Sequence, residues 1–345
     1  MDINILQGDA LEVLKKLPNK SVNCVVTSPP YWALRSYLPD EHIDKKKELG
    51  LEENPNDYIM KLCDIFDEVK RVLRDDGTCW VNLGDTYYTK SGGKFENDTI
   101  AKKNKEQVTN STGINKANEL RGRGFLPEKS LANIPARFSI EMQKRGWTLR
   151  NHIIWKKDNV FPTSVKDRFT VDYESVFFFV KNKNYWFEQQ FEPLSDETIK
   201  DIGRRTNLVR ATGEKGSKHF NNENSPYNSA FTNRRRDEFV DLEKGRNKRT
   251  VWHINTKPYS ESHFAVFPEK LVETPIKAGC PVGGVVMDIF MGSGTVGVVA
   301  LRQNKKFIGI DLNSEYIKIA EKRIKNYKEK ELIYEDGTRG LERWM

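Results

Sequence analysis

The chain has 345 residues, 37% of them hydrophobic, and this length predicts one large domain carrying an inserted lobe. It contains no apolar run of about eighteen residues, which excludes a membrane-spanning helix, and its amino terminus lacks the basic-then-apolar layout of a signal peptide. The net charge of +8 favours a polyanionic partner, because the excess is concentrated in residues 89–124 and 201–250.

Strands and helices alternate at both ends of the chain, as in a doubly wound parallel sheet. Near the amino terminus we expect a strand at 3–6, a helix at 10–17, a buried strand at 22–27, a helix at 58–73, a turn at 75–77 and a strand at 78–83. Near the carboxyl terminus we expect a strand at 284–290, a glycine-rich loop at 291–294, a helix at 295–302, a strand at 307–311 and a helix at 314–327. The middle is interrupted by two polar segments, 89–124 and 188–250.

The glycine-rich loop places Gly292 and Gly294 where a strand turns into a helix. Glycine tolerates positive φ and lets a ligand approach the backbone closely. The spacing is not that of a dinucleotide-binding GxGxxG. The next strand ends in Asp311, about twenty residues on, where a carboxylate can hold ribose hydroxyls. Together these features predict a nucleoside cofactor without a pyrophosphate.

The pattern Asp288-x-Phe290-x-Gly292-x-Gly294 resembles motif I of the amino-group DNA methyltransferases, which use S-adenosyl-L-methionine. The stretch His263 to Leu271 is similar to the segment before that motif, and Gly8-Asp9-Ala10 to the acidic element near the cofactor adenine. Asp9 also suits an N-cap, and His263 a capping or core histidine. The resemblance implies cofactor binding by Asp9, Thr27, His263, Phe267, Asp288, Phe290, Gly292, Ser293, Gly294, Thr295 and Asp311.

The sequence Thr27-Ser28-Pro29-Pro30-Tyr31-Trp32 follows the buried strand 22–27. Two prolines remove two N–H donors and leave a carbonyl without a ladder partner. An exocyclic base amine is a poor nucleophile, and hydrogen bonds accepted by the Ser28 hydroxyl and the Pro29 carbonyl would favour its attack on the sulfonium methyl. We therefore predict Ser28, Pro29, Pro30 and Tyr31 as catalytic residues, with Tyr31 stacking on a flipped base and Trp32 extending the stacking wall. A rigid Pro-Pro turn among core aromatics is the alternative.

The catalytic motif comes first and the cofactor motif last, an order that resembles the beta class of N4-cytosine and N6-adenine DNA methyltransferases. Further similarity lies at 71–85, 166–170 and 173–177. The resemblance implies an α/β fold: a doubly wound, mostly parallel methyltransferase sheet with an inserted target-recognition region. It divides the chain into a catalytic half (1–88), a mobile polar loop (89–124), a core continuation (125–187), a target-recognition region (188–250) and a cofactor-binding half (251–345).

Double-stranded DNA is the expected partner. Basic residues predicted to contact it, beside Trp32, are Arg234, Arg235, Arg236, Arg246, Lys248 and Arg249. Basic solvated loops are the alternative reading of these segments. A separate restriction endonuclease and a homodimer remain open, and no fused nuclease is recognisable.

A serine before Pro-Pro resembles the cytosine-N4 members, whereas Asp or Asn is usual in adenine-N6 members. N4-cytosine is therefore the first choice. Adenine N6, RNA and a catalytically silent DNA-binding protein remain as alternatives. The four cysteines, Cys24, Cys63, Cys79 and Cys280, form neither a zinc pattern nor a disulfide framework, which indicates no metal and a cytoplasmic location.

Overall fold

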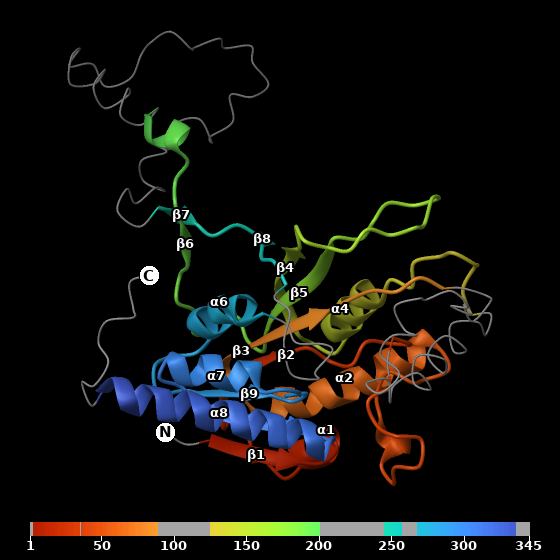
Figure 1. Cartoon of the computed structure of the whole chain (residues 1–345), viewed down its shortest axis with the longest axis horizontal. Helices are drawn as coiled ribbons and strands as arrows, with labels where there is room; N and C mark the ends of the chain where they lie inside the picture. The colour runs from red at the N-terminus through yellow and green to blue at the C-terminus, as the bar shows by residue number, and fades with distance from the viewer. Residues whose placement is uncertain (1–2, 35, 89–124, 201–244, 257–267, 336–345) are drawn as a thin grey trace. The chain divides into compact units, whose positions relative to one another are not determined.

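The computed structural model describes residues 3–34, 36–88, 125–200, 245–256 and 268–335 (Figure 1). The chain divides into two compact units, one formed by Met1–Glu188 with Thr250–Met345 and the other by Gln189–Arg249. His263, Phe267 and Arg234 to Arg236 lie outside the described residues, as does the polar segment 89–124.

The first unit is built on an eight-stranded sheet with the order β1-β10-β9-β2-β3-β5-β4-β8. Neighbouring strands run parallel except that β5 is antiparallel to β3 and β4. The mostly parallel, doubly wound α/β fold is thus confirmed. The strands are β1 (Ile3–Gln7), β2 (Val22–Thr27), β3 (Leu73–Leu83), β4 (Thr148–Lys156), β5 (Tyr173–Val180), β8 (Val251–His253), β9 (Val285–Asp288) and β10 (Lys306–Asp311).

Helices cover both faces of this sheet, and neighbouring residues of a strand pack against different sets of helices. Val25 packs in one apolar cluster with α1 (Ala10–Leu14), α2 (Pro55–Val72) and α4 (Ile134–Lys144). Its neighbours Cys24 and Val26 pack in a second cluster with α6 (Glu269–Gly279), α7 (Thr295–Arg302) and α8 (Ser314–Glu335). Because successive side chains of a strand point to opposite faces, β2 carries buried apolar side chains on both faces.

The expected turn at 75–77 is instead part of β3, which begins at Leu73. Leu73 pairs with Val22, and the ladder resumes only at Thr78 opposite Cys24, so the turn-forming residues make an irregularity within the strand. The lysine-rich 3-10 helix η1 (Lys45–Lys47) was not expected. None of the helices in the described ranges has the length and apolar composition needed to cross a bilayer.

In the second unit, β6 (Phe191–Glu192) and β7 (Arg246–Asn247) form an antiparallel pair. The Glu192 carboxylate accepts from Arg246 Nε at 2.8 Å and from Arg249 Nε at 2.5 Å. Arg246 and Arg249, two of the arginines predicted to contact DNA, therefore have a carboxylate partner in this unit. Lys248 donates its backbone N–H to the Gln190 carbonyl.

Candidate active site

The predicted site residues gather at the carboxyl edge of the parallel strands. Strands β1, β10, β9 and β2 lie side by side, and they end at Gln7, Asp311, Asp288 and Thr27. Loops that follow adjacent parallel strands leave the sheet at the same edge, which is where ligands bind in open α/β sheets. Residues near 9, 28, 290 and 311 are thereby brought together although they are far apart in the sequence.

A cavity of about 660 Å³ lies at this edge. The predicted cofactor residues Asp9, Phe290, Gly292 and Asp311 line it, and so does the predicted catalytic residue Ser28. Two further walls were not anticipated from the sequence: the segment containing Tyr37 and Glu48, and the start of α8 at Tyr316. The cavity thus brings the predicted catalytic motif after β2 and the glycine-rich cofactor motif after β9 together within one unit.

Asp311 fixes the backbone of the glycine-rich loop. Its Oδ2 accepts from the Gly292 N–H at 2.7 Å, and its Oδ1 accepts from the Asn313 N–H at 2.8 Å. Burial raises the pKa of Asp311 to about 6, against the opposing effect of these backbone donors. Each oxygen keeps a second lone pair, so the carboxylate can still accept hydroxyl donors from the cavity.

Asp288 lies at the end of β9 and is only 1% exposed. Its Oδ1 accepts from the Thr27 hydroxyl at 2.7 Å and from the Phe290 N–H at 3.1 Å. Its Oδ2 is buried and has no hydrogen-bond partner among the described residues. Burial raises the pKa of Asp288 to about 7. The Thr27 bond joins the two motif-bearing strands directly.

Ser293, Gly294 and Thr295 hold the loop against α8. Arg323 donates to the Ser293 hydroxyl at 2.9 Å and to the Thr295 hydroxyl at 3.1 Å. Gly294 has φ of 78°, and a Cβ there would come within 2.9 Å of the Ala320 Cβ. These three residues do not line the cavity. Thr27 and Asp288 are likewise absent from the lining, so direct cofactor contact by these five residues stays a prediction. The contacts to α8 show that Ser293, Gly294 and Thr295 shape the turn that presents Gly292 to the cavity.

Asp9 has the capping role that the sequence left open. Its Oδ1 accepts from the Glu12 N–H at 3.1 Å at the start of α1. Its place in the cavity lining leaves the adenine-side role as a prediction.

The loop after β2 is fixed through its backbone. Tyr58 of α2 donates its hydroxyl to the Pro30 carbonyl at 2.8 Å. Pro29 is buried, and within the described ranges no donor reaches its carbonyl. The Pro30 carbonyl is thus hydrogen-bonded within the protein, and the Pro29 carbonyl is left for another donor.

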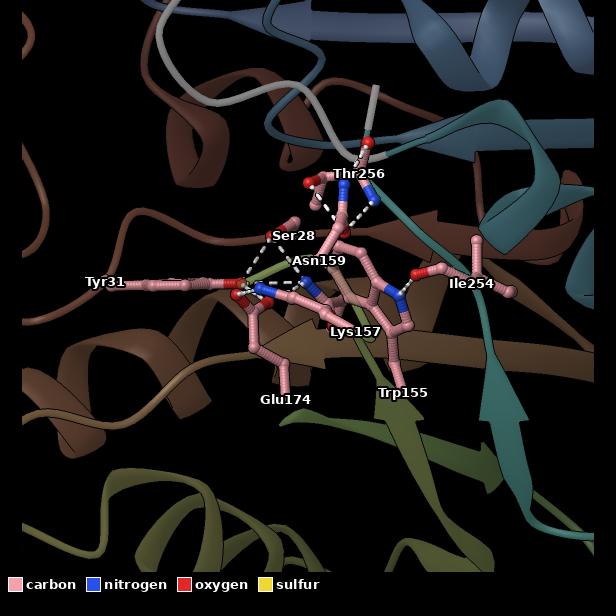
Figure 2. A network of polar contacts seen from close by, with 9 residues as sticks. Ser28, Tyr31, Trp155, Lys157, Asn159, Glu174, Ile254 and Thr256 are labelled. Carbon is pink, nitrogen blue, oxygen red and sulfur yellow. Dashed lines mark hydrogen bonds and ion pairs between the residues drawn. The ribbon is translucent and has the colours of Figure 1, made fainter. Parts of the chain in front are cut away.

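A chain of polar contacts surrounds the catalytic loop (Figure 2). The Ser28 hydroxyl lies 3.4 Å from the Tyr31 hydroxyl, to which it donates, and Tyr31 donates to Glu174 Oε2 at 2.6 Å. Asn82 Nδ2 lies 2.8 Å from the Tyr31 oxygen and 2.9 Å from Glu174 Oε2. Lys157 pairs with the other oxygen of Glu174. Burial and the Glu174 charge raise the pKa of Tyr31, so its hydroxyl stays protonated.

The structure contradicts the predicted contact of Trp32 with DNA. It is 1% exposed, and its Nε1 donates to the Glu52 carbonyl at 3.0 Å. An indole buried with its N–H satisfied is a core residue. The Pro-Pro loop turns Tyr31 toward the polar network and its neighbour Trp32 into the core.

Sequence reasoning gave no role to Asn82, Lys157 or Glu174. Asn82 and Glu174 fall within stretches that resemble the family, and that was the available signal. Tyr37 gave no such signal. It is held by the Asn313 side chain, which donates to the Tyr37 carbonyl at 3.1 Å, and its ring packs edge-on to Tyr316.

The cavity lining fits a nucleoside with a positively charged amino-acid side chain. Asp9 and Asp311 supply carboxylate oxygens, while Phe290, Tyr37 and Tyr316 supply apolar and aromatic surface. Gly292 has φ of 51° and presents bare backbone at the same wall. Flat apolar surfaces suit a purine ring, and carboxylates suit hydroxyls and a cation.

Comparison with known proteins agrees with this arrangement. A model of the N6/N4 DNA methylase family matches residues 22–322. The Type II methyltransferase M.Cfr9I of Citrobacter freundii is 38% identical over 324 residues, which cover 93% of this chain and 87% of that protein.

Two solved structures share the fold. PvuII DNA methyltransferase (cytosine-N4-specific) has a TM-score of 0.56 at 18% identity, covering 96% of this chain and 92% of that one. The Thermus thermophilus protein TTHA0409, solved with S-adenosyl-L-methionine, has a TM-score of 0.51 at 20% identity, with 94% of each chain covered. With the family model matching most of its length, the chain belongs to the N6/N4 DNA methylase family.

Proposed function

We propose that this DNA methyltransferase transfers a methyl group from S-adenosyl-L-methionine to the exocyclic N4 amine of a flipped-out cytosine in double-stranded DNA, in the cytoplasm. One observation carries the proposal: Ser28 lines the same cavity as Gly292 and Asp311. An amine hydrogen-bonded to Ser28 therefore lies at the edge of the cofactor pocket. The family relationship and the TTHA0409 complex support the choice of cofactor.

The polar network prepares Ser28 to accept a hydrogen bond. Tyr31 donates its proton to Glu174, so the Tyr31 oxygen is an acceptor for Ser28. With its proton directed at Tyr31 and Asn82 Nδ2 donating to it at 3.4 Å, the Ser28 oxygen keeps one lone pair for the incoming amine. The Pro29 carbonyl supplies the second acceptor. Two acceptors draw the amine protons out of the base plane and free the nitrogen lone pair for attack.

When bound, S-adenosyl-L-methionine supplies an electrophilic sulfonium methyl group. Asp311 would hold the ribose, Asp9 the adenine side, and Asp288 with the Gly292 backbone the amino-acid side. Phe290 and Tyr37 would exclude water from the transfer path. Exclusion of water strengthens every electrostatic contact at the reacting centre.

Residues 188–250 are proposed as the target-recognition region, since the separate unit Gln189–Arg249 interrupts the methyltransferase unit there. Arg234, Arg235 and Arg236 are proposed to contact DNA on sequence grounds. Replacing all three with Gln should weaken DNA binding and lower its salt dependence, as fewer counterions are released. An unchanged salt slope contradicts this assignment. A cognate restriction endonuclease is proposed from the Type II relative.

The choice of base rests on Ser28 preceding Pro-Pro and on the fold shared with a cytosine-N4-specific enzyme. An adenine amine could form the same two hydrogen bonds, so adenine N6 is the second candidate. A catalytically silent binding protein would not need the Ser28 geometry.

The deciding experiment identifies the modified base. The purified protein is incubated with S-adenosyl-L-methionine and unmethylated PCR-amplified DNA of mixed sequence, and the DNA is digested to nucleosides for mass spectrometry. N4-methylcytosine is the expected product. N6-methyladenine would overturn the base assignment while keeping the mechanism, and Ser28→Ala, sampled at the same early time, provides the slow control. Absence of any methylated base with intact cofactor binding would contradict activity on DNA.

A further inference from the structure

The loop between β4 and β5 carries an unusual amount of exposed aromatic surface. We name residues 158–171 the β4–β5 finger; it extends away from the ends of the two strands (Figure 1, yellow-green). Phe161 is 93% exposed and Phe169 is 95% exposed. Val165 and Val171, in the same finger, are also exposed. Single exposed apolar residues are ordinary, but a group of them on one loop marks an interaction surface.

The base of the finger is anchored, so the exposure is not that of a frayed end. Lys157 closes the loop by donating its N–H to the Asp172 carbonyl at 2.7 Å. The Asn159 side chain donates to the Thr256 carbonyl at 2.8 Å and accepts from the Thr256 N–H at 3.1 Å (Figure 2). The two ends of the finger are thus held while its aromatic rings are exposed.

The return half of the finger is also held. The Arg168 guanidinium stacks 3.7 Å from the Tyr87 ring centroid, and Asp167 pairs with Lys129 at 2.6 Å. These contacts hold the side chains of Asp167 and Arg168, and the next ring, Phe169, lies in solvent.

The finger lies beside the reaction site. Lys157, which precedes the finger, and Glu174, three residues beyond its end, belong to the network that holds Tyr31 and Ser28. A duplex that delivers a base to Ser28 therefore comes close to the base of the finger. The finger has no net charge, with Lys166 and Arg168 balanced by Asp158 and Asp167. Both carboxylates are paired with lysines outside the finger, whereas Lys166 has no carboxylate within ion-pair distance among the described residues.

We propose that the β4–β5 finger is a DNA-contact element in which Phe161 and Phe169 stack on bases of the duplex opened beside the methylation site. This inference rests on the proposed function, since an enzyme that flips a base leaves a gap in the stack. Apolar side chains inserted between bases fill such gaps, and aromatic rings stack on any base. Lys166 contacts the adjoining phosphate.

The direct test is photochemical cross-linking. Mixed-sequence DNA is prepared by PCR with 5-iodo-deoxyuridine triphosphate in place of thymidine triphosphate, bound to the full chain and irradiated. Iodouracil cross-links to aromatic rings stacked on it, and mass spectrometry identifies the peptide. Cross-links at Phe161 or Phe169 are expected. Cross-links found only outside the finger would overturn the proposal.

The functional test uses the Phe161→Ala/Phe169→Ala variant. Methyl transfer to unmodified mixed-sequence DNA should fall by about tenfold or more, with unchanged cofactor affinity and an unchanged melting temperature, because each lost stack weakens DNA engagement while no packing is removed. Val282→Ala is the matched control: Val282 is 78% exposed and precedes β9, at the opposite edge of the sheet. Transfer by the double variant within about twofold of the unaltered protein would contradict the proposal.

Two other outcomes are decisive. If the double variant loses self-association in sedimentation while keeping transfer and DNA affinity, the finger is a protein interface and the DNA proposal fails. If the unaltered protein forms iododeoxyuridine cross-links through the finger but yields no methylated base, the finger proposal stands and the proposed function fails.

Discussion

The Tyr31 hydroxyl donates a 2.6 Å hydrogen bond to the Glu174 carboxylate, across 143 residues of sequence. This contact joins the loop after β2 to the start of β5. It is possible because β5 is antiparallel to β3, so that Ser175 pairs with Leu83 and the start of β5 lies at the carboxyl edge of the sheet. Glu174 thus orients Tyr31, and through Tyr31 the Ser28 hydroxyl.

A double-mutant cycle tests this coupling. Tyr31→Phe and Glu174→Gln should each slow single-turnover methyl transfer by about tenfold, since a hydrogen bond to a charged group contributes about 1.5–3 kcal/mol. The double variant should be little slower than either single variant, because both changes remove the same bond. Tyr173→Phe, next to Glu174 and half-exposed, is the control. Fully additive effects would show that Tyr31 and Glu174 act independently.

Gly84 should be indispensable for the position of the Tyr31 ring. A Cβ at Gly84 would lie 2.5 Å from Tyr31 Cε2, closer than atoms can approach, so Gly84→Ala must displace the ring. We expect transfer to slow by about tenfold or more with cofactor affinity retained. Gly283→Ala is the control: its Cβ meets nothing within 4 Å, and its φ of 73° costs only backbone strain of about 1 kcal/mol. Normal transfer by Gly84→Ala, measured at a saturating DNA concentration, would show that the ring position is unimportant.

Ser28 and Asp311 should divide the two tasks of the site. Ser28→Ala should slow transfer by about a hundredfold while changing cofactor affinity by less than about twofold, because Ser28 acts at the reacting amine. Asp311→Ala should weaken cofactor binding by about tenfold or more, since it removes both an acceptor and the anchor of the Gly292 N–H. Calorimetric cofactor binding and single-turnover rates measure the two effects. Equal losses in both quantities for both variants would refute the division.

Much of this site could be predicted from sequence because its parts follow buried strands. The apolar run Val22–Thr27 and the acid-terminated strand ending at Asp311 are local signals, and parallel pairing brings their ends together. The Glu174 contact could not be predicted, since it depends on which strand is antiparallel and in what register. Trp32 was misjudged because an aromatic residue in a motif does not reveal whether it points to solvent or to the core. The contacts of the Ser293 and Thr295 hydroxyls could not be predicted either, because their partner Arg323 lies on a later helix.

The buried carboxyl of Asp288 should make stability of the ligand-free protein depend on pH. Its pKa is raised from 3.8 to about 7 by burial. Between these values the folded protein keeps a proton that the unfolded chain has released, so the free energy of unfolding falls as pH rises through this window. Asp311, with a pKa raised to about 6, acts in the same direction.

Asp288→Asn removes this dependence at one site, because the amide is neutral at every pH. The variant's free energy of unfolding, relative to the unaltered protein, should therefore increase as pH rises from about 4.5 to about 8, as denaturant titrations at several pH values would show. Asp76→Asn, which removes a half-exposed carboxyl paired with Arg74 away from the cavity, is the comparison. A difference between Asp288→Asn and the unaltered protein that is constant with pH would mean that the Asp288 carboxyl is already ionised below this window, despite its burial.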